Sequence, residues 1–400
     1  MPSFFAVYFE HKSKYLKHKT IGGNVMKKIK NIVFTLLVIS ALCFSVTAAE
    51  LELNSTSACL MEASTGRILY EINADEKLEP ASVTKIMSLI LVFEAMDEGK
   101  LNLDTPVSGS DHASSMGGSQ IWLEPGETMT VNEMLKAVVV ASANDCTVAL
   151  GEFVAGSEES FVAMMNEKAK QLGMENTHFV NCTGLPAENH YTTARDIAIM
   201  TRELHKHSKV YDYTKIWMDS LRDGEFGITN TNKLIRFYNG ATGMKTGYTS
   251  SALYCMSATA ERDGMNLIAA VMKAETSDKR FADAKKLLEY GFANYSLYKP
   301  EVPKFEKMKV LDGKENSVGI SADVSDVLIE KGYKNKIEID IELSESVTAP
   351  VEKNTTVGKV KYNADGKEIA VFPIVTTESV EKITFFDILR RLMGASVSVR

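Results

Sequence analysis

Residues 80–87 of this 400-residue chain read PASVTKIM, and an apolar run continues from Val83 to Met96. The run is long and free of glycine, which predicts a buried helix. Pro80 suits the first turn of that helix, where its missing N–H would have no partner. Ser82 and Lys85 then lie three residues apart on one face, where an amine can reach a hydroxyl. A serine hydroxyl becomes a nucleophile when a neighbouring base accepts its proton, and a partly buried lysine can be that base.

A second polar group follows a second predicted helix. The capping-box pattern TVNE at residues 130–133 begins this helix, and its apolar positions stop just before Ser142-Ala143-Asn144. A hydroxyl at Ser142 can relay a proton between Lys85 and a leaving amine, while the Asn144 amide can orient Lys85 and hold a substrate carbonyl. Taken alone, these residues also suit an ordinary polar helix end.

A third group, Lys245-Thr246-Gly247, lies in a predicted strand. A cation and a hydroxyl at the end of a strand can bind a carboxylate together. Glycine at the next position lets a substrate backbone lie close against that strand. By itself this tripeptide is common, so its value depends on the other two groups.

The remaining pattern of this region predicts an α/β domain. Strands and a turn are expected over 58–72, further helices near 157–172, 193–205 and 278–291, and strands near 244–246, 253–260 and 266–272. Helices in the middle with strands at both ends favour one antiparallel sheet, closed by N- and C-terminal strands, with helices on both sides.

After a linker at about 296–303 the pattern changes to short strands. Residues 337–343 read IEIDIEL, a clean alternation, and Asp-Gly turns lie at 312–313 and 365–366. We therefore expect a separate small β-sandwich extending to about residue 378.

The tail from Ser379 is predicted to be an amphipathic helix. Its apolar positions recur at helical spacing and are Phe385, Ile388, Leu389, Leu392 and Met393. Such a stripe can pack on its own domain or lie in a membrane surface, and we favour the membrane.

The N-terminal region has the parts of a secretory signal. From Met26, lysines precede an apolar run over 32–46 and the small residues Thr47-Ala48-Ala49. Cleavage is expected after Ala49 or Ala48, the alternative is an uncleaved membrane anchor, and translation could begin at Met26. The net charge is −7 for the whole chain and −13 without the first 49 residues. An acidic balance of this kind gives no indication of nucleic-acid binding, which is typically marked by an excess of clustered Lys and Arg.

The cysteines and histidines show no metal pattern. Four cysteines follow the signal, namely Cys59, Cys146, Cys182 and Cys255, but they are far apart and lack CxxC spacing. We expect them to be small buried side chains rather than disulfides or ligands. The seven histidines include no HExxH motif. No metal or cofactor is therefore expected.

In their order along the chain, the three polar groups resemble the SxxK, SxN and KTG set of the penicillin-binding proteins and serine β-lactamases. The chain as a whole resembles a D-alanyl-D-alanine carboxypeptidase of the low-molecular-mass penicillin-binding type, over about residues 50 to 393. Other segments that read like this family are SAND at 142–145, HFVN at 178–181, GL at 184–185, YTTARD at 191–196 and KTGYT at 245–249.

The resemblance implies a role for each matching residue. Ser82 would be the acylated nucleophile, Lys85 its general base and Ser142 a proton relay. Asn144 would orient the substrate, while Lys245 and Thr246 would receive its terminal carboxylate. The backbone N–H groups of Ser82 and Tyr248 would form the oxyanion hole, and Arg280 is either a second carboxylate partner or a surface residue of its helix.

The resemblance also implies an organisation and partners. The expected parts are an N-terminal extension and signal at 1–49 (the signal at about 26–49), a transpeptidase/β-lactamase-like catalytic domain at 50–297, a β-rich domain at 298–378 and a membrane-surface helix at 379–400. The expected partners are the pentapeptide stem of peptidoglycan, β-lactams as covalent inhibitors and the membrane surface. The protein would be exported to the extracytoplasmic face of the membrane or to the cell wall.

Two alternatives share some of these features. A class A β-lactamase carries the same three motifs but uses a loop glutamate and a water for deacylation, and Glu188 lies in the corresponding loop here. A non-catalytic wall-binding module would have lost a member of the motifs, and all members are present. A loop that reads like the carboxypeptidases and an additional β-rich domain favour the carboxypeptidase.

Overall fold

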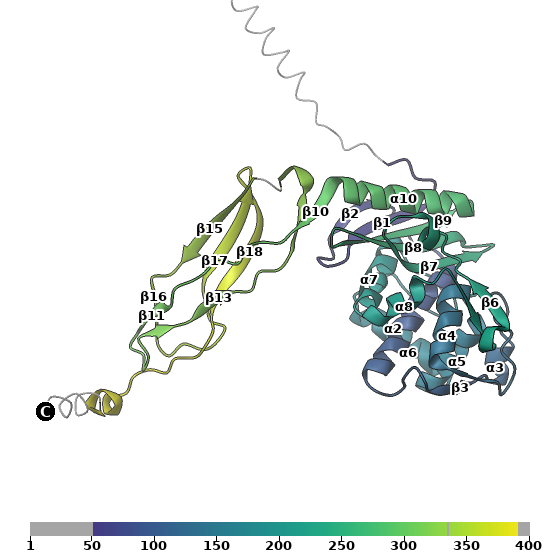
Figure 1. Cartoon of the computed structure of the whole chain (residues 1–400), viewed down its shortest axis with the longest axis horizontal. Coiled ribbons are helices and arrows are strands. Elements are labelled where there is room, and N and C mark those ends of the chain that lie inside the picture. The colour runs from purple at the N-terminus through teal and green to yellow at the C-terminus, as the bar shows by residue number, and fades with distance from the viewer. Residues whose placement is uncertain (1–50, 334–335, 391–400) are drawn as a thin grey trace, which may run out of the picture. The chain divides into compact units, whose positions relative to one another are not determined.

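The computed structural model describes residues 51–333 and 336–390. Its centre is a five-stranded antiparallel sheet with strand order β2-β1-β9-β8-β7 (Figure 1). The strands are β1 (Ser57–Glu62), β2 (Ile68–Ile72), β7 (Ala241–Thr249), β8 (Leu253–Arg262) and β9 (Met265–Ala274). The N-terminal hairpin thus pairs with the last strand of the domain, which confirms the predicted fold class.

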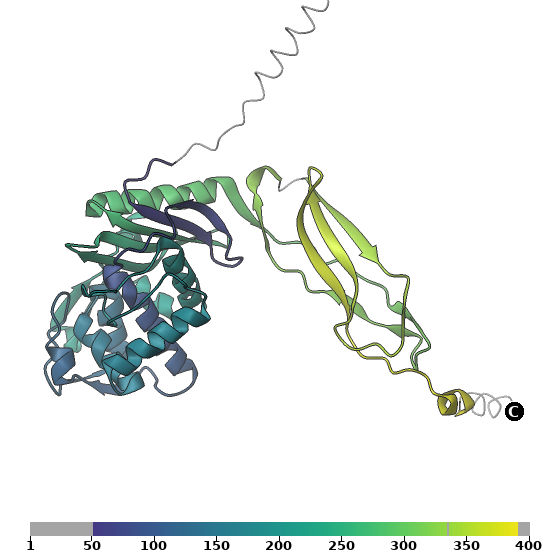
Figure 2. The same ribbon diagram turned by 180° about the vertical axis from the view of Figure 1, so that it is seen from behind.

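Helices cover both faces of this sheet, as the two opposite views show (Figures 1 and 2). One face is covered by α10 (Ser277–Asn294), whose Asp283 is buried and accepts hydrogen bonds from the backbone N–H groups of Asn54 and Ser55, both at 2.8 Å. On the other face, η1 (Ala81–Thr84), α2 (Lys85–Asp97), α7 (Ala194–His205) and α8 (Tyr211–Thr214) contact the sheet. The remaining helices on that side pack around these and are α4 (Val131–Lys136), η2 (Ala137–Ala141), α5 (Asn144–Ala155), α6 (Glu158–Gln171) and η3 (Ser208–Val210).

Short elements complete the domain. They are the hairpin of β3 (Pro106–Ser108) and β4 (Thr128–Thr130), the hairpin of β5 (Met218–Leu221) and β6 (Phe226–Thr229) with η4 (Arg222–Gly224) between them, and the single turns α3 (Asp111–Ser114) and α9 (Leu234–Phe237).

The two helices that carry the first polar groups differ in detail from expectation. The residues of α2 from Lys85 to Phe93 are buried on all sides, as the apolar run predicted, but η1 before it is a 3₁₀ turn. The capping box at Thr130 forms, yet the helix widens into the π-type turn η2 and stops at Ser142, which is left-handed (φ 65°). Asn144 is therefore the first residue of a new helix, α5, which the sequence reasoning did not separate.

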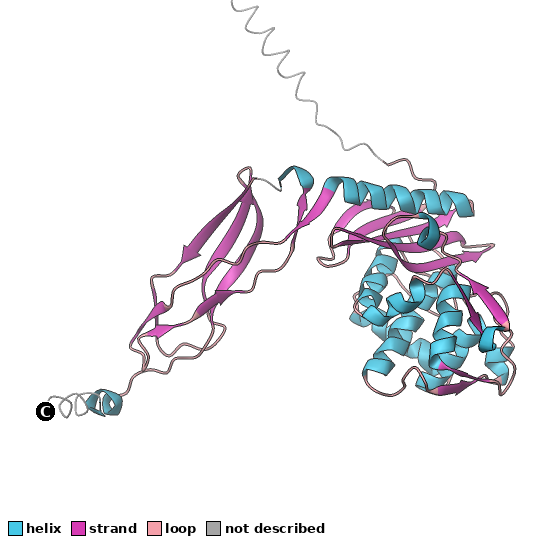
Figure 3. Ribbon diagram, in the orientation of Figure 1, coloured by secondary structure: helices cyan, strands magenta, loops and turns pink. Residues whose placement is uncertain are grey.

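The C-terminal region is a domain of strands, as predicted (Figure 3). Its three sheets have the orders β13-β18-β17-β15, β12-β11-β16 and β10-β14. The strands are β10 (Tyr295–Tyr298), β11 (Met308–Leu311), β12 (Ser317–Val318), β13 (Ile320–Ala322), β14 (Val327–Glu330), β15 (Ile337–Leu343), β16 (Ser346–Thr348), β17 (Thr356–Ala364) and β18 (Lys367–Thr376), with η5 (Lys331–Tyr333). Its core contains the buried Val360, Tyr362 and Ile374.

The helical tail begins later than predicted. Val380 pairs with Val351, and Lys382 pairs with Gly313, as isolated β-bridges, so the residues after Ser379 first continue the strand pairing. The helix begins at Phe385, because Thr384 and Asp387 exchange the reciprocal hydrogen bonds of a helix start.

The described part of this helix, residues 385–390, has an exposed apolar side. Phe385 and Phe386 are 72% and 76% exposed, and Ile388 and Leu389 are exposed as well. Leu392, Met393 and the predicted signal lie outside the described residues. A helix with the length and hydropathy needed to cross a bilayer is not found among the described residues.

Candidate active site

Lys85 Nζ is the centre of the first cluster of polar side chains. It lies 3.1 Å from Ser82 Oγ, 2.5 Å from Asn144 Oδ1 and 2.7 Å from the carbonyl oxygen of Thr183. These partners come from the turn before α2, the start of α5 and the loop after α6. Lys85 itself is fully buried at the first position of α2.

The partners of Lys85 determine how a neutral amine would sit there. The Asn144 and Thr183 oxygens are carbonyl oxygens, which can only accept hydrogen bonds. The Asn144 orientation is determined because its Nδ2 donates to the carbonyl oxygen of Gly117 at 2.6 Å. Two N–H groups of a neutral amine would point at these two oxygens, so its lone pair would face the Ser82 hydroxyl, which can donate.

Electrostatics favour the neutral amine at this position. Burial lowers the pKa of Lys85 from its ordinary value to about 7, because the charged form loses its hydration. Asp145 opposes this shift only in part. Near neutral pH a substantial fraction of Lys85 is therefore a free base beside a hydroxyl.

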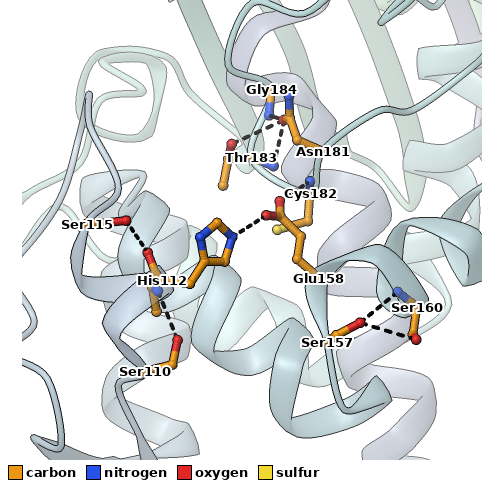
Figure 4. Close-up of polar contacts among 11 residues, drawn as sticks. Ser110, His112, Ser115, Ser157, Glu158, Ser160, Asn181, Cys182, Thr183 and Gly184 are labelled. Carbon is orange, nitrogen blue, oxygen red and sulfur yellow. Dashed lines mark hydrogen bonds and ion pairs between the residues drawn. The ribbon is translucent and has the colours of Figure 1, made fainter.

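The loop that contains Thr183 is built to present its carbonyl oxygen to Lys85. The Asn181 side chain accepts hydrogen bonds from the N–H groups of Thr183 at 3.2 Å and Gly184 at 2.7 Å, which forms a tight turn (Figure 4). The Glu158 carboxylate accepts a hydrogen bond from Cys182 N at 3.1 Å and pairs with His112 Nε2 at 2.7 Å (Figure 4). The turn is thereby tied to both α6 and α3.

The same loop supports the Ser82 turn through a buried histidine. His190 Nδ1 accepts a hydrogen bond from Val180 N at 3.1 Å, so in the neutral ring Nε2 holds the proton and donates to Thr84 Oγ1 at 2.9 Å. Burial lowers the pKa of His190 to about 4, which keeps this arrangement at neutral pH.

A second cluster contains Lys245, Ser142 and Thr246. Lys245 Nζ donates to Ser142 Oγ and to the carbonyl oxygen of Thr246, both at 2.9 Å. The Thr246 hydroxyl lies 2.6 Å from the Thr231 hydroxyl. Burial lowers the pKa of Lys245 well below its ordinary value, and the positive charges of Lys85 and Arg280 act in the same direction.

Strand β7 brings the second cluster next to the first. A Cβ at Gly247 would lie 2.9 Å from Ser82 N, so glycine is needed for this close approach. Tyr248 follows on the same strand; it is 55% exposed, and its ring is tilted against the Tyr254 ring with a centroid distance of 4.5 Å. All seven residues that the sequence analysis selected for the site therefore lie on these two neighbouring clusters or on the strand that joins them.

Arg280 lies behind this strand. It is buried and donates to the carbonyl oxygens of Gly247 at 3.1 Å and Cys255 at 3.3 Å, while its Nε has no partner among the described residues. It is thus neither a surface residue of α10 nor a member of either cluster. It supports β7 from behind.

Sequence reasoning did not find several residues that shape the site. Asp145 is buried and accepts hydrogen bonds from the N–H groups of Ile121 and Leu123, both at 3.0 Å, which holds the loop from 117 to 123 beside Asn144. Thr183 and Thr231 contribute a carbonyl and a hydroxyl. A backbone acceptor such as the Thr183 carbonyl leaves no residue-type signal in a sequence. Asp145 is a charged side chain directly after Asn144, so the sequence could have indicated its role.

Comparison with known proteins identifies the family. The sequence model of the D-alanyl-D-alanine carboxypeptidases matches residues 44–276, more than half of the chain. The chain belongs to the D-alanyl-D-alanine carboxypeptidase family. A second model, for the C-terminal domain of penicillin-binding protein 5, matches residues 292–382.

Curated relatives match this carboxypeptidase along most of its chain. D-alanyl-D-alanine carboxypeptidase DacF from Bacillus subtilis is 42% identical over 384 residues, which cover 92% of this chain and 98% of that protein. D-alanyl-D-alanine carboxypeptidase DacC from Escherichia coli is 35% identical over 338 residues, covering 82% and 84%.

Solved structures agree with the carboxypeptidase fold. Penicillin-binding protein 5 from Haemophilus influenzae has a TM-score of 0.76 and 31% identity, covering 84% of this chain and 100% of that one. Penicillin-binding protein D2 from Listeria monocytogenes, in its ampicillin-bound form, has a TM-score of 0.56 and 33% identity, covering 60% and 99%. The resemblance seen in the sequence is thus confirmed. The matches and the exposed position of Glu188 both count against the class A β-lactamase alternative.

The contact between the Gly184 turn and η1 gives a test of the carboxypeptidase site. A Cβ at Gly184 (φ +84°) would overlap the carbonyl oxygen of Ala81, whereas a Cβ at Gly173 (φ +73°) would meet open space. Alanine at either position carries the cost of a left-handed residue, about 1–2 kcal/mol, but only Gly184→Ala should displace the turn that carries Ser82.

We expect Gly184→Ala to slow labelling by a fluorescent penicillin by about tenfold or more, because small displacements of reacting groups can cost about a hundredfold. Gly173→Ala is the matched control and should label at the wild-type rate. Wild-type labelling of a folded Gly184→Ala protein would contradict the importance of this contact.

Proposed function

We propose that the chain is a serine-type D-alanyl-D-alanine carboxypeptidase that removes the terminal D-alanine from the pentapeptide stem of peptidoglycan. The observation that carries this proposal is the placement of a fully buried lysine, with its pKa lowered to about 7, at 3.1 Å from a serine hydroxyl. Membership of the carboxypeptidase family and relatives of the same name along most of the chain support it.

In this proposal Ser82 is the nucleophile and Lys85 its general base. The lone pair of a neutral Lys85 would take the Ser82 proton while Oγ attacks the carbonyl carbon between the two D-alanines. Ser142, which lies 2.9 Å from Lys245 Nζ, would pass a proton to the amine of the departing D-alanine. Asn144 would orient the substrate as well as Lys85.

Lys245 and Thr246 would bind the terminal carboxylate. Burial lowers the pKa of Lys245 in a site without an anion, and the neighbouring Lys85 and Arg280 act in the same direction. A bound carboxylate reverses that balance, so substrate binding would be accompanied by protonation of Lys245. The ammonium group and the Thr246 hydroxyl then hold the carboxylate together.

The oxyanion would be held by the backbone N–H groups of Ser82 and Tyr248. Its collapse breaks the C–N bond, releases D-alanine with the relayed proton and leaves an ester on Ser82. Water then attacks this ester while Lys85 accepts a proton from the water. Lys85 returns that proton to Ser82 Oγ as the acyl–oxygen bond breaks, and the shortened peptide leaves with its new carboxylate. A β-lactam would follow the first half of this path, with its opened ring still attached to the enzyme.

We also propose where the enzyme acts. Export would remove residues 1–49, which contain the signal at about 26–49. The mature protein would then have a catalytic domain at 50–297, a β-rich domain at 298–378 and an anchor at 379–400. The exposed apolar side chains of residues 385–390 support insertion into the outer face of the cell membrane. The enzyme would then meet peptidoglycan at the membrane or in the wall.

Release of D-alanine tests the activity and its nucleophile together. The mature protein should release D-alanine from diacetyl-L-Lys-D-Ala-D-Ala, and Ser82→Ala should lose this release because, in the described part of the chain, Ser82 supplies the one hydroxyl bonded to Lys85 Nζ. Ser251→Ala, which changes an exposed serine bonded to Glu79, is the control and should remain active. Release by folded Ser82→Ala at the wild-type rate would refute the assignment.

The lowered pKa of Lys85 predicts the pH dependence of acylation. The amine accepts a proton only when neutral, so the rate should rise with pH through about 7 and level off above it. Below about 7, each pH unit should lower the rate about tenfold, since the neutral fraction falls in that proportion. Stopped-flow acylation by a chromogenic β-lactam measures this, and a rate that is constant across this range would show that Lys85 is not the base.

The exposed tail predicts binding to lipid. Truncation after Glu381 and the single change Ile388→Asp should both reduce sedimentation of the mature protein with phospholipid vesicles, because each removes apolar area from the exposed side of the helix. Ile341→Asp is a matched control, since Ile341 on β15 is equally exposed at 44%. Undiminished sedimentation of the truncated protein would disprove the anchor.

A further inference from the structure

Trp122 is an exposed tryptophan close to the candidate site. Its side chain is 65% exposed and its backbone is left-handed (φ 53°). It follows Ser119, whose carbonyl oxygen accepts a hydrogen bond from Asn144 N at 2.7 Å. Trp122 therefore lies on the loop that is hydrogen-bonded to Asn144, within about 11 Å of Ser119 along the chain.

The strained backbone of Trp122 is held from two sides. The Asp145 carboxylate accepts hydrogen bonds from the backbone N–H groups of Ile121 and Leu123, the two residues that flank Trp122. Arg222, which pairs with Glu127 at 2.7 Å, donates to the carbonyl oxygens of Ile121 at 3.0 Å and Trp122 at 3.3 Å. Strain persists where the surroundings enforce it, and ligand-binding positions are the common case. The ring is thus presented to solvent on a fixed support.

An acidic hollow of about 410 Å³ lies on one side of this ring, and its volume is within the range of small-ligand sites. Its lining includes Trp122, Ser114 and the carboxylates of Asp111 and Glu124. Neither carboxylate has an ion pair with a described residue, whereas the hollow on the other side contains Arg222. The buried Ser114 Oγ has no hydrogen-bond partner among the described residues.

These groups together fit a cation with N–H donors. An aromatic face attracts a positive charge, two carboxylates can pair with it, and an unpartnered hydroxyl oxygen can accept one of its hydrogens. We propose that the acidic hollow binds the side-chain ammonium group of the residue that precedes D-Ala-D-Ala in the substrate. The inference rests on the proposed function and makes Trp122 and Glu124 determinants of stem-peptide specificity.

The reach of the substrate is consistent with this assignment. Ser82 would attack the carbonyl of the penultimate residue, so the preceding residue lies about 3.5 Å further along an extended chain. A four-carbon side chain at that position would carry its ammonium group toward the loop at 117–123, which is hydrogen-bonded to Asn144 through Gly117 and Ser119. A sugar could also stack on Trp122, but it has no charge to match the two unpaired carboxylates.

Two peptides that differ only in this charge test the inference. D-alanine release is measured from Nα-acetyl-L-Lys-D-Ala-D-Ala, whose side-chain amine is free, and from the Nα,Nε-diacetyl peptide. We expect the wild-type protein to prefer the free amine by about tenfold in kcat/KM, the size of a cation–π contact with a partly exposed ion pair. The preference should shrink in 1 M NaCl, where the Debye length is about 3 Å.

Variants of the hollow test whether the preference for the free amine arises there. Trp122→Ala and Glu124→Gln should each reduce the ratio between the two peptides toward one, and Trp122→Phe should retain part of it. Phe237→Ala is the matched control, because Phe237 is 64% exposed but lines neither hollow, and its ratio should equal the wild-type ratio.

The outcomes separate the inference from the proposed function. Release from both peptides at equal rates by the wild-type protein, or a preference that survives in both Trp122→Ala and Glu124→Gln, would overturn the ammonium site while leaving the carboxypeptidase intact. A ratio near one, with Trp122→Ala slowing only the digestion of intact glycan-linked peptide, would point to sugar instead. Release from neither peptide would overturn the proposed function and the inference with it.

Discussion

The burial of one lysine side chain constrains most of the catalytic domain. Lys85 is enclosed at the start of α2, and two of its three partners, Asn144 and Thr183, come from segments that are distant in sequence. The shift in its pKa to about 7 has a consequence for folding, because an unfolded lysine titrates near 10.4. Between these values the unfolded chain binds more protons, so this group makes the fold more stable as the pH rises from about 7 toward 10. The same burial that prepares a base therefore costs stability at neutral pH.

The break between η2 and α5 allows Ser142 and Asn144 to contact two different lysines. A continuous helix would carry Ser142 and Asn144 on different faces, since residues two apart do not share one. The left-handed Ser142 breaks the helix, so that its hydroxyl reaches Lys245 while Asn144 begins a new helix and reaches Lys85. Asp145 then anchors the neighbouring loop, and the two clusters are joined through a single short break in the backbone.

Sequence patterns predicted the sheet and its helices, because periodicity is a property of residue type. They also selected seven candidate site residues, which the fold brings into two neighbouring clusters and onto the strand between them. They did not predict what depends on backbone groups. The carbonyl of Thr183 and the contact of Gly247 with Ser82 N have no side-chain signature. The start of the terminal helix was misplaced for a related reason. Val380 and Lys382 form β-bridges with Val351 and Gly313, and this non-local pairing overrides the local helical periodicity.

The four cysteines of the described chain are free and buried. Burial raises the pKa of Cys59 to about 12 and that of Cys255 to about 11, so the folded protein presents almost no thiolate to an oxidant. Unfolding would expose all four at once, with ordinary pKa values near 8.5. In an oxidising medium these thiols would pair at random before the chain could refold. The working lifetime of the protein there would depend on how slowly it unfolds, rather than on the equilibrium between folded and unfolded chains.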